Sequence, residues 1–190
     1  MAIKKIKTAI FISGRGSNLK SLINFSKKKN SSIVIKLVVS NNPIAKGLQY
    51  AKKSKIKNFV TLFNNKNISE KNILKKLYKN KIELICLAGF MKILSKNFII
   101  KFKKPIINIH PSLLPKYKGL NTHKRVLKNK EVVSGSTVHL VTSKLDSGKI
   151  ILQKKVNVTN SETIESLEKK ILKIEHILYP KAIKKFLSSL

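Results

Sequence analysis

The segment Ile106-Ile-Asn-Ile-His-Pro-Ser-Leu-Leu-Pro-Lys-Tyr-Lys-Gly119 begins as a strand and ends as a loop. Its isoleucines are β-branched and apolar, which is typical of a buried strand. Pro111 cannot donate to a sheet, so the strand is predicted to end at His110. Asn108 and His110 are two residues apart and therefore point to the same face. An amide and an imidazole thus lie side by side at the carboxyl end of a strand, where open α/β sheets bind ligands.

A single polar residue in a strand is often only a hydrogen-bonded core group. Here two polar residues share one face and run directly into a proline-rich loop. That combination favours a functional site over two satisfied core residues.

Length and composition are typical of a globular protein. The chain has 190 residues, 42% of them hydrophobic, and we expect one domain over residues 1–190. No apolar run approaches the roughly 20 residues of a membrane helix. The apolar segment Ala9–Ile12 is too short for a secretory signal, which favours a cytoplasmic protein with no membrane partner. The only cysteine, Cys86, lies in an apolar run and is predicted to be a core residue.

The charge is strongly positive. Lys and Arg number 41 and Asp and Glu 8, giving a net charge of +33. Such an excess is common in nucleic-acid-binding proteins, but here only Arg15 and Arg125 are arginines, and the lysines are spread along the whole chain. Ile, Asn and Lys all have A/T-rich codons, so we interpret the excess as genome drift and expect no nucleic-acid partner. The charge would still steer anionic substrates toward the protein.

Hydrophobic periodicity predicts alternating strands and helices. The nearly continuous apolar strand 33–40 is typical of a parallel sheet covered on both faces. Strands 132–141 and 150–157 are joined by a short connection, which predicts an antiparallel pair. The predicted fold is a single-domain α/β protein with a Rossmann-like, mostly parallel twisted sheet, helices on both faces and an antiparallel edge. The other predicted strands are 8–13, 58–63 and 84–88, and the predicted helices are 19–28, 47–53, 69–79, 122–129 and one after residue 162.

A glycine turn follows the first predicted strand. Gly14-Arg-Gly-Ser-Asn18 precedes a helix, and such a turn lets the first helical amides approach an anion. The turn lacks the third glycine of the dinucleotide fingerprint, and no acidic residue follows the second strand to bind a ribose. A nicotinamide dinucleotide site is therefore rejected.

The central segment also carries a family resemblance. Asn108-Ile-His-Pro-Ser-Leu-Leu-Pro115 resembles the signature of the folate-dependent formyltransferases. Its continuation as Lys116-Tyr117, Gly119-Leu120 and Thr122-His123 resembles the phosphoribosylglycinamide formyltransferase family. The resemblance extends from Thr8 to Pro180. It implies transfer of a formyl group from the co-substrate 10-formyltetrahydrofolate to the amino group of glycinamide ribonucleotide, a step of purine synthesis. The products are formylglycinamide ribonucleotide and tetrahydrofolate, the partners are these small molecules, and the protein is a monomer or homodimer.

The same resemblance implies roles for individual residues. Asn108 and His110 would stabilise the oxyanion, and His110 would act as general acid. Asp146, the only aspartate, would raise the pKa of His110, although Asp-Ser-Gly is also ordinary turn chemistry. Gly16, Ser17 and Asn18 would hold the nucleotide phosphate, and Glu175 the ribose or glycinamide end. The folate residues would be Met91, Lys92, Ile93, Leu94, Asn108, Thr142 and Asp146.

Several features stay open or depart from the family. His139 is either a core residue or a support for the site. The family pattern implies a cis bond at Leu114–Pro115, and Leu172 replaces a polar residue that the family commonly carries. We expect no strand after Pro180, where the family commonly has one. Ser69, Ser95 and Thr159–Glu162 are predicted to cap helices. No Cys and His cluster has metal-ligand spacing, so no metal is expected.

Two alternative functions are carried forward. Methionyl-tRNA formyltransferases share the central motif, but they continue it with Arg-Gly-Ala and add a β-barrel domain. This chain has Lys118-Gly-Leu120 instead. The second alternative is a nucleic-acid-binding module on an α/β scaffold. It would bind any polyanion in a salt-sensitive manner and would not need Asn108 or His110.

Overall fold

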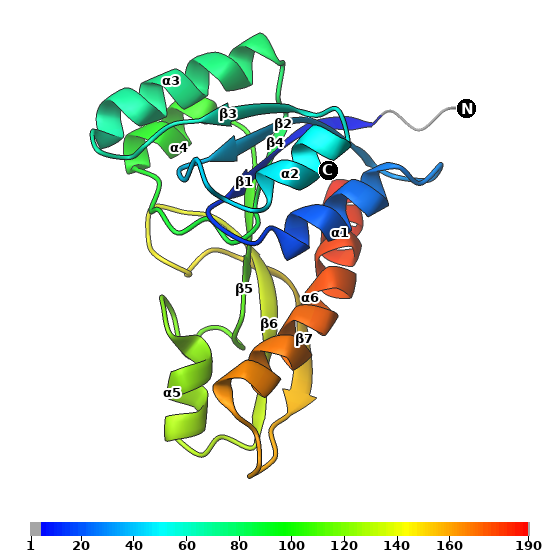
Figure 1. Cartoon of the computed structure of the whole chain (residues 1–190), viewed down its shortest axis with the longest axis vertical. Helices are drawn as coiled ribbons and strands as arrows, with labels where there is room; N and C mark the ends of the chain where they lie inside the picture. The colour runs from blue at the N-terminus through cyan, green and yellow to red at the C-terminus, as the bar shows by residue number, and fades with distance from the viewer. Residues whose placement is uncertain (1–4, 190) are drawn as a thin grey trace. The chain divides into compact units, whose positions relative to one another are not determined.

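Strand β5 (Ile106–His110) lies where the chain passes from one compact unit to another (Figure 1). Unit 1 extends to Ile107 and unit 2 begins at Asn108. The structure, a computed structural model, describes residues 5–189. The expectation of one domain over the whole chain stays a prediction.

Unit 1 alternates strands and helices, as the hydrophobic periodicity predicted. Its strands pair in parallel in the order β3-β2-β1-β4. Helices α1 and α2 pack against β2, and α3 packs against α4 (Figure 1). The elements are β1 (Ile6–Ile12), α1 (Ser17–Ser26), β2 (Ile33–Ser40), α2 (Leu48–Lys53), β3 (Lys57–Val60), α3 (Lys66–Lys79), β4 (Leu84–Leu87) and α4 (Lys96–Phe102).

The core of unit 1 lies along its two central strands. Every residue of β4 and the last five residues of β1, Thr8 to Ile12, are buried. Because neighbouring residues of a strand point to opposite faces, both faces of these strands are covered. Burial on both sides explains why these segments appear in the sequence as continuous apolar runs. It also fixes the strand ends from which the loops of unit 1 emerge.

Unit 2 contains the antiparallel part of the fold. It comprises the end of β5, helix α5 (Thr122–Lys128), strands β6 (Val133–Leu140) and β7 (Ile150–Asn157) and helix α6 (Ile164–Leu187). β6 and β7 pair in antiparallel fashion, and β7 has no other neighbour. Helix α6 packs on both strands and on α5. The predicted α/β class, with a mostly parallel sheet and an antiparallel edge, is confirmed.

Two predicted helix caps are wrong. Helix α3 begins after Asn65, whose side chain accepts from a backbone amide, and Ser69 lies inside the helix. The capping box of α6 is formed by Thr163 and Ser166 rather than by Thr159–Glu162, which forms a turn. The hydroxyl of Ser166 accepts from the amide of Thr163, and the hydroxyl of Thr163 accepts from the amide of Ser166, so a carboxylate at the third position is not required.

Other local predictions are confirmed. Ser95 caps α4 by accepting from Phe98, the Leu114–Pro115 bond is cis, and Cys86 is buried. Helix α6 continues through Pro180 to Leu187, and no strand follows it up to residue 189. Within residues 5–189, no helix is both long and apolar enough to cross a membrane.

Candidate functional site

Four polar side chains converge in unit 2. Asn108 and His110 end β5, His139 lies near the end of β6, and Asp146 lies in the loop between β6 and β7. β6 and β7 are antiparallel, and the loop that joins them returns Asp146 toward the end of β6. The pairing of these strands therefore positions a carboxylate beside both histidines.

His110 is bonded at both ring nitrogens. Its Nδ1 lies 3.4 Å from Asp146 Oδ2, and both side chains are less than 10% exposed. Its Nε2 donates to the backbone carbonyl of Tyr117 at 2.8 Å. Asp146 is held in turn by the amide of Gly119, which donates to Oδ2 at 2.9 Å. The ring therefore lies between two fixed acceptors, an arrangement that suits an imidazolium.

His139 connects the two predicted catalytic groups. Its Nδ1 donates to the carbonyl of Leu140 at 2.8 Å. Its Nε2 lies 3.2 Å from Asn108 Nδ2 and 3.6 Å from Asp146 Oδ1. The sequence left two interpretations of His139 open, and the residue is both buried and in contact with the cluster. Since the Asn108 amide carries two N–H bonds, one of them remains available to a ligand.

Burial and hydrogen bonding oppose each other in this cluster. Burial lowers the pKa of His110 and outweighs the Tyr117 carbonyl and the Asp146 charge, which both raise it. Burial raises the pKa of Asp146, but the interactions with His139, the Gly119 amide and His110 together lower it. Asp146 is therefore a carboxylate at neutral pH. Its charge favours the protonated form of His110, but burial outweighs this effect, and the predicted role of Asp146 stays a prediction.

Glu175 lies beneath the strand that carries His110. It is 4% exposed, and its Oε1 accepts from the hydroxyl of Ser136 at 3.1 Å. The same hydroxyl contacts the backbone carbonyl of His110 at 2.9 Å. Helix α6 thus brings the carboxylate predicted to bind ribose or glycinamide to the end of β5 within unit 2.

The predicted phosphate loop lies in unit 1. Gly16 is the N-cap of α1 at φ 74°, a left-handed conformation that favours glycine. A Cβ at Gly16 would lie 2.5 Å from the Cα of Gly47, and the amide of Gly47 donates to the Gly14 carbonyl at 3.0 Å. No side chain caps α1, so the loop presents the amides of Ser17 and Asn18 at a helix start.

Ser13 joins this loop to the predicted folate segment. Its amide donates to the carbonyl of Gly89 at 3.0 Å, and its hydroxyl accepts from the amide of Met91 at 2.7 Å. The same hydroxyl donates to the side chain of Asn41. The phosphate loop and the segment that begins the predicted folate wall are therefore held together within unit 1.

The predicted folate residues differ in exposure. Met91 and Ile93 are more than 60% exposed, which leaves apolar surface for a ring system, and Lys92 is also exposed. Leu94 is 5% exposed and belongs to the core. In unit 2, Thr142 is exposed, and its hydroxyl bonds to the backbone of Lys144.

Among residues 5–189, no group of three His, Cys, Asp or Glu side chains is placed to hold a metal ion. The expectation that no metal takes part stays a prediction.

Sequence reasoning missed the groups that act through the backbone. The carbonyl of Tyr117 contacts His110, the amide of Gly119 contacts Asp146, and the backbone of Gly47 packs against the predicted phosphate loop. No side-chain pattern encodes these contacts. Positive φ angles at Tyr117 and Gly119 mark the bend that brings their backbone groups to the cluster.

Comparison with known proteins identifies relatives over nearly the whole chain. The formyl transferase family model matches residues 6–183. A phosphoribosylglycinamide formyltransferase of Haemophilus influenzae is 40% identical over 183 residues, which cover 95% of this chain and 86% of that protein. The chicken (Gallus gallus) trifunctional purine biosynthetic protein adenosine-3 is 42% identical over 182 residues, 94% of this chain but only 18% of that protein.

A solved structure agrees with these sequence matches. The crystal structure of phosphoribosylglycinamide formyltransferase from Brucella melitensis matches with a TM-score of 0.91 and 42% identity, covering 96% of each chain. The match includes the segments that carry both predicted sites. This chain therefore belongs to the formyl transferase family.

Proposed function

We propose that the protein transfers the formyl group of 10-formyltetrahydrofolate to the amino group of glycinamide ribonucleotide, in purine synthesis. The observation that carries the proposal is the buried arrangement of Asn108, His110 and Asp146 in unit 2. An amide donor and an imidazole–carboxylate pair at one strand end suit acyl transfer to an amine. The names of the relatives point to this acceptor.

The first step forms the new C–N bond. The substrate amine attacks the formyl carbon, and the carbonyl electrons move to oxygen to give a tetrahedral oxyanion. The free N–H of Asn108 donates to that oxygen, and the positive charge of protonated His110 stabilises it. Each such donor is typically worth about 10²–10³ in rate.

The second step breaks the bond between the formyl carbon and the folate nitrogen. The departing nitrogen takes a proton from His110, directly or through a water, and the attacking amine returns a proton to the imidazole by the same route. The products are formylglycinamide ribonucleotide and tetrahydrofolate, so the proton count balances. Asp146 acts by favouring the protonated form of His110.

The remaining groups bind the two substrates. The amides of Gly16, Ser17 and Asn18 hold the phosphate, Glu175 holds the ribose or glycinamide end, and Met91–Leu94 with Thr142 contact the folate. Because these groups belong to different units, we propose that both units act as one formyltransferase domain. The assignment implies a cytoplasmic protein that acts as a monomer or homodimer.

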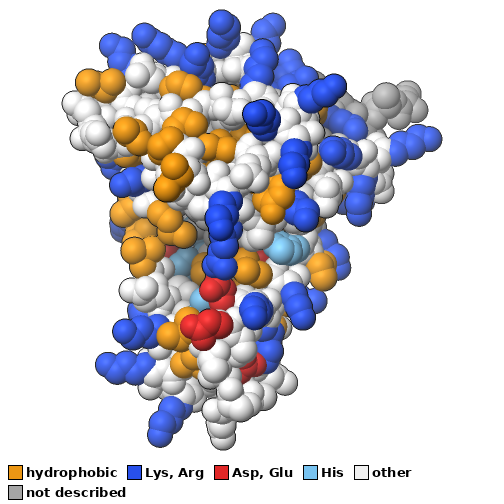
Figure 2. All heavy atoms as spheres, in the orientation of Figure 1, with side chains coloured by type: hydrophobic (Ala, Val, Ile, Leu, Met, Phe, Trp, Pro, Cys, Tyr) orange, Lys and Arg blue, Asp and Glu red, His pale blue; other side chains and the backbone are white. Residues whose placement is uncertain are grey.

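The high charge fits this proposal better than a nucleic-acid function. Figure 2 shows Lys and Arg side chains distributed over the face in view rather than gathered into one stripe. A spread of this kind on that face attracts anionic substrates without aligning the cations along one path.

A formyl-transfer assay with purified protein tests the proposal. Glycinamide ribonucleotide is compared with glycinamide alone and with methionyl-tRNA as acceptors. We expect tetrahydrofolate to be released only with the ribonucleotide. Transfer to methionyl-tRNA, or release of tetrahydrofolate independent of acceptor, would overturn the proposed substrate.

A further inference from the structure

Tyr117 has an unusual backbone for its residue type and touches the proposed general acid. Its φ is 57°, in the left-handed region that costs a non-glycine residue roughly 1–2 kcal/mol. In this conformation its carbonyl accepts from His110 Nε2 at 2.8 Å. This contact is shorter than the 3.4 Å between His110 and Asp146. Something must therefore hold Tyr117 in place.

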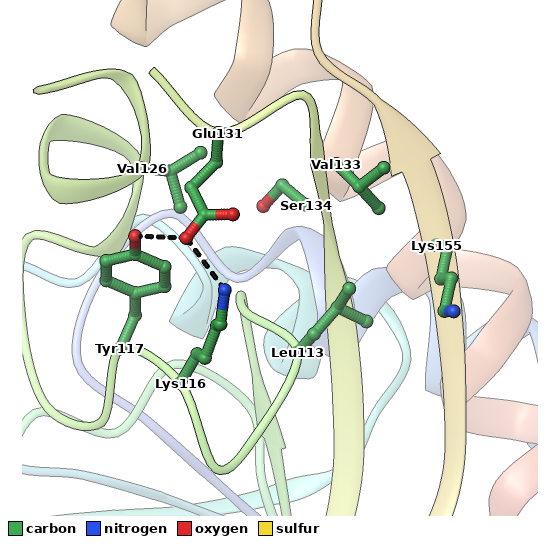
Figure 3. A pocket seen from close by; sticks show the side chains of 8 residues that line it. All are labelled: Leu113, Lys116, Tyr117, Val126, Glu131, Val133, Ser134 and Lys155. Atoms are coloured by element: carbon green, nitrogen blue, oxygen red, sulfur yellow. Dashed lines mark hydrogen bonds and ion pairs between the residues drawn. The ribbon is translucent and has the colours of Figure 1, made fainter. Parts of the chain in front are cut away.

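The phenol of Tyr117 is anchored at its far end. Its hydroxyl donates to Glu131 Oε1 at 2.8 Å and accepts from Asn129 Nδ2 at 2.9 Å. Lys116 Nζ contacts the same Glu131 oxygen at 2.9 Å, as Figure 3 shows. The guanidinium of Arg125 lies 5.2 Å from the centre of the ring. Hydrogen bonds from Lys116 and Tyr117 lower the pKa of Glu131, so the anchor is a carboxylate at neutral pH.

Packing alone does not fix the ring. Tyr117 packs against the cluster that contains Val126, but it also lines a cavity of about 290 Å³ (Figure 3). Glu131 and Ser134 line the same cavity, so one side of the phenol has free space. The hydrogen bonds of the phenol with Glu131 and Asn129, and the Arg125 contact, therefore keep the ring from turning into that space.

We propose that Tyr117 is a positioning residue: Glu131 anchors its phenol, and the anchored residue presents its carbonyl to His110 Nε2, where the contact favours the protonated form of the ring. The proposal rests on the proposed function, in which His110 is the general acid. It adds a residue whose action passes through its backbone.

The physical reason is the count of protons on the ring. A neutral imidazole that donates from Nε2 to the Tyr117 carbonyl turns a lone pair at Nδ1 toward the Asp146 carboxylate, whereas an imidazolium turns an N–H toward each of them. Each acceptor therefore favours the protonated ring. Burial and the nearby charges of His139 and Arg125 lower the pKa of His110. His123 also interacts electrostatically with His110. Misalignment of the Tyr117 carbonyl removes one of the two stabilising contacts.

The test uses Tyr117→Phe, which keeps the ring and removes only the hydroxyl. The pKa of His110 is read by NMR of histidine-labelled protein, with His110→Ala to assign its signal. We expect the pKa of His110 to fall and kcat at neutral pH to drop about five-fold, as for loss of a hydrogen bond of about 1 kcal/mol. KM should stay unchanged. An unchanged His110 pKa in folded Tyr117→Phe would overturn the proposal.

Three further variants sharpen the test. Glu131→Ala should reproduce the effect, and it keeps the proposal testable should Tyr117→Phe fold poorly. Glu131→Gln retains an acceptor for the phenol and should restore most of the activity. Lys116→Met removes only an exposed ion pair and should leave the His110 pKa and kcat unchanged.

The two readouts separate this proposal from the proposed function. A lowered His110 pKa with unchanged kcat would support the positioning role of Tyr117. The same result would contradict the assignment of His110 as general acid.

Discussion

The two proposed binding regions use different parts of the chain, backbone groups in unit 1 and side chains in unit 2. In unit 1, the Gly14–Asn18 loop is shaped by backbone, with Gly16 in a left-handed conformation against the backbone of Gly47. In unit 2, side chains form the site, with His110 and Asp146 in a buried pair. A backbone site fails when its shape changes, and a side-chain site fails when its protonation changes. The comparison therefore predicts which kinetic parameter each substitution alters.

The largest expected effect is that of His110→Ala. If the side chains of unit 2 carry the chemistry, loss of the imidazole removes the general acid and the charge that stabilises the oxyanion, and kcat should fall by about 10²–10³ or more. Steady-state kinetics with both substrates measure this. KM for the nucleotide should hardly change, and circular dichroism controls for folding. A variant that loses affinity but keeps kcat would break the comparison.

Asp146→Asn should have a smaller effect that depends on pH. The amide keeps the shape of the carboxylate but removes the charge that raises the pKa of His110, so that pKa should fall further. Because the proposed acid acts in its protonated form, activity is lost as pH rises through that pKa. The alkaline limb of the kcat profile should therefore move to lower pH. A fall of one unit in the pKa of His110 corresponds to an about ten-fold lower kcat at pH values above that pKa.

The control for that profile is the wild-type protein in the same buffers. An identical pH profile for Asp146→Asn would remove the carboxylate from the mechanism. It would also weaken the claim that unit 2 is governed by protonation.

Gly16→Ala tests the backbone site. The left-handed φ and the 2.5 Å approach to Gly47 both oppose a side chain here. We expect KM for the nucleotide to rise about ten-fold, as for a strain of roughly 1–2 kcal/mol, with kcat nearly unchanged. Gly14→Ala is the matched control, because a Cβ at Gly14 meets nothing within 4 Å. Equal effects of the two substitutions would show that loop shape is not what binds the phosphate.

The smallest expected effect is on stability against pH. Burial lowers the folded-state pKa of both His110 and His123 below the usual value. As the pH falls below about 6.5, the unfolded chain binds more protons than the folded chain. The free energy of unfolding therefore decreases as the pH falls through this range. Urea midpoints between about pH 7 and 5 should decrease. His123→Ala should make this decrease shallower, and a slope equal to that of the wild type would contradict the assignment.

Strands and side-chain chemistry were the predictable parts of this molecule. Strands 33–40 and 150–157 were predicted with the bounds that the structure has, because β-branched runs there end at turn residues. The convergence of Asn108, His110 and Asp146 followed from a motif and a family resemblance. These signals reside in side chains, which a sequence displays directly.

Contacts made by backbone groups were not predictable. The carbonyl of Tyr117 and the close approach of Gly16 to Gly47 depend on how distant loops pack. The caps of α3 and α6 were misplaced for a related reason. Asn65 and the Thr163–Ser166 pair are the observed caps. The residues predicted from the sequence are of equally suitable types, so the local pattern could not distinguish between the two sets.

The most direct test is a crossed measurement of single-turnover rates for His110→Ala and Gly16→Ala, with both substrates saturating. Saturation removes the binding defect of Gly16→Ala, so its rate should lie within about two-fold of the wild type. His110→Ala should remain at least about 100-fold slower, because substrate concentration cannot replace a proton donor. A wild-type rate for His110→Ala would contradict the claim that the side-chain cluster of unit 2 performs the transfer.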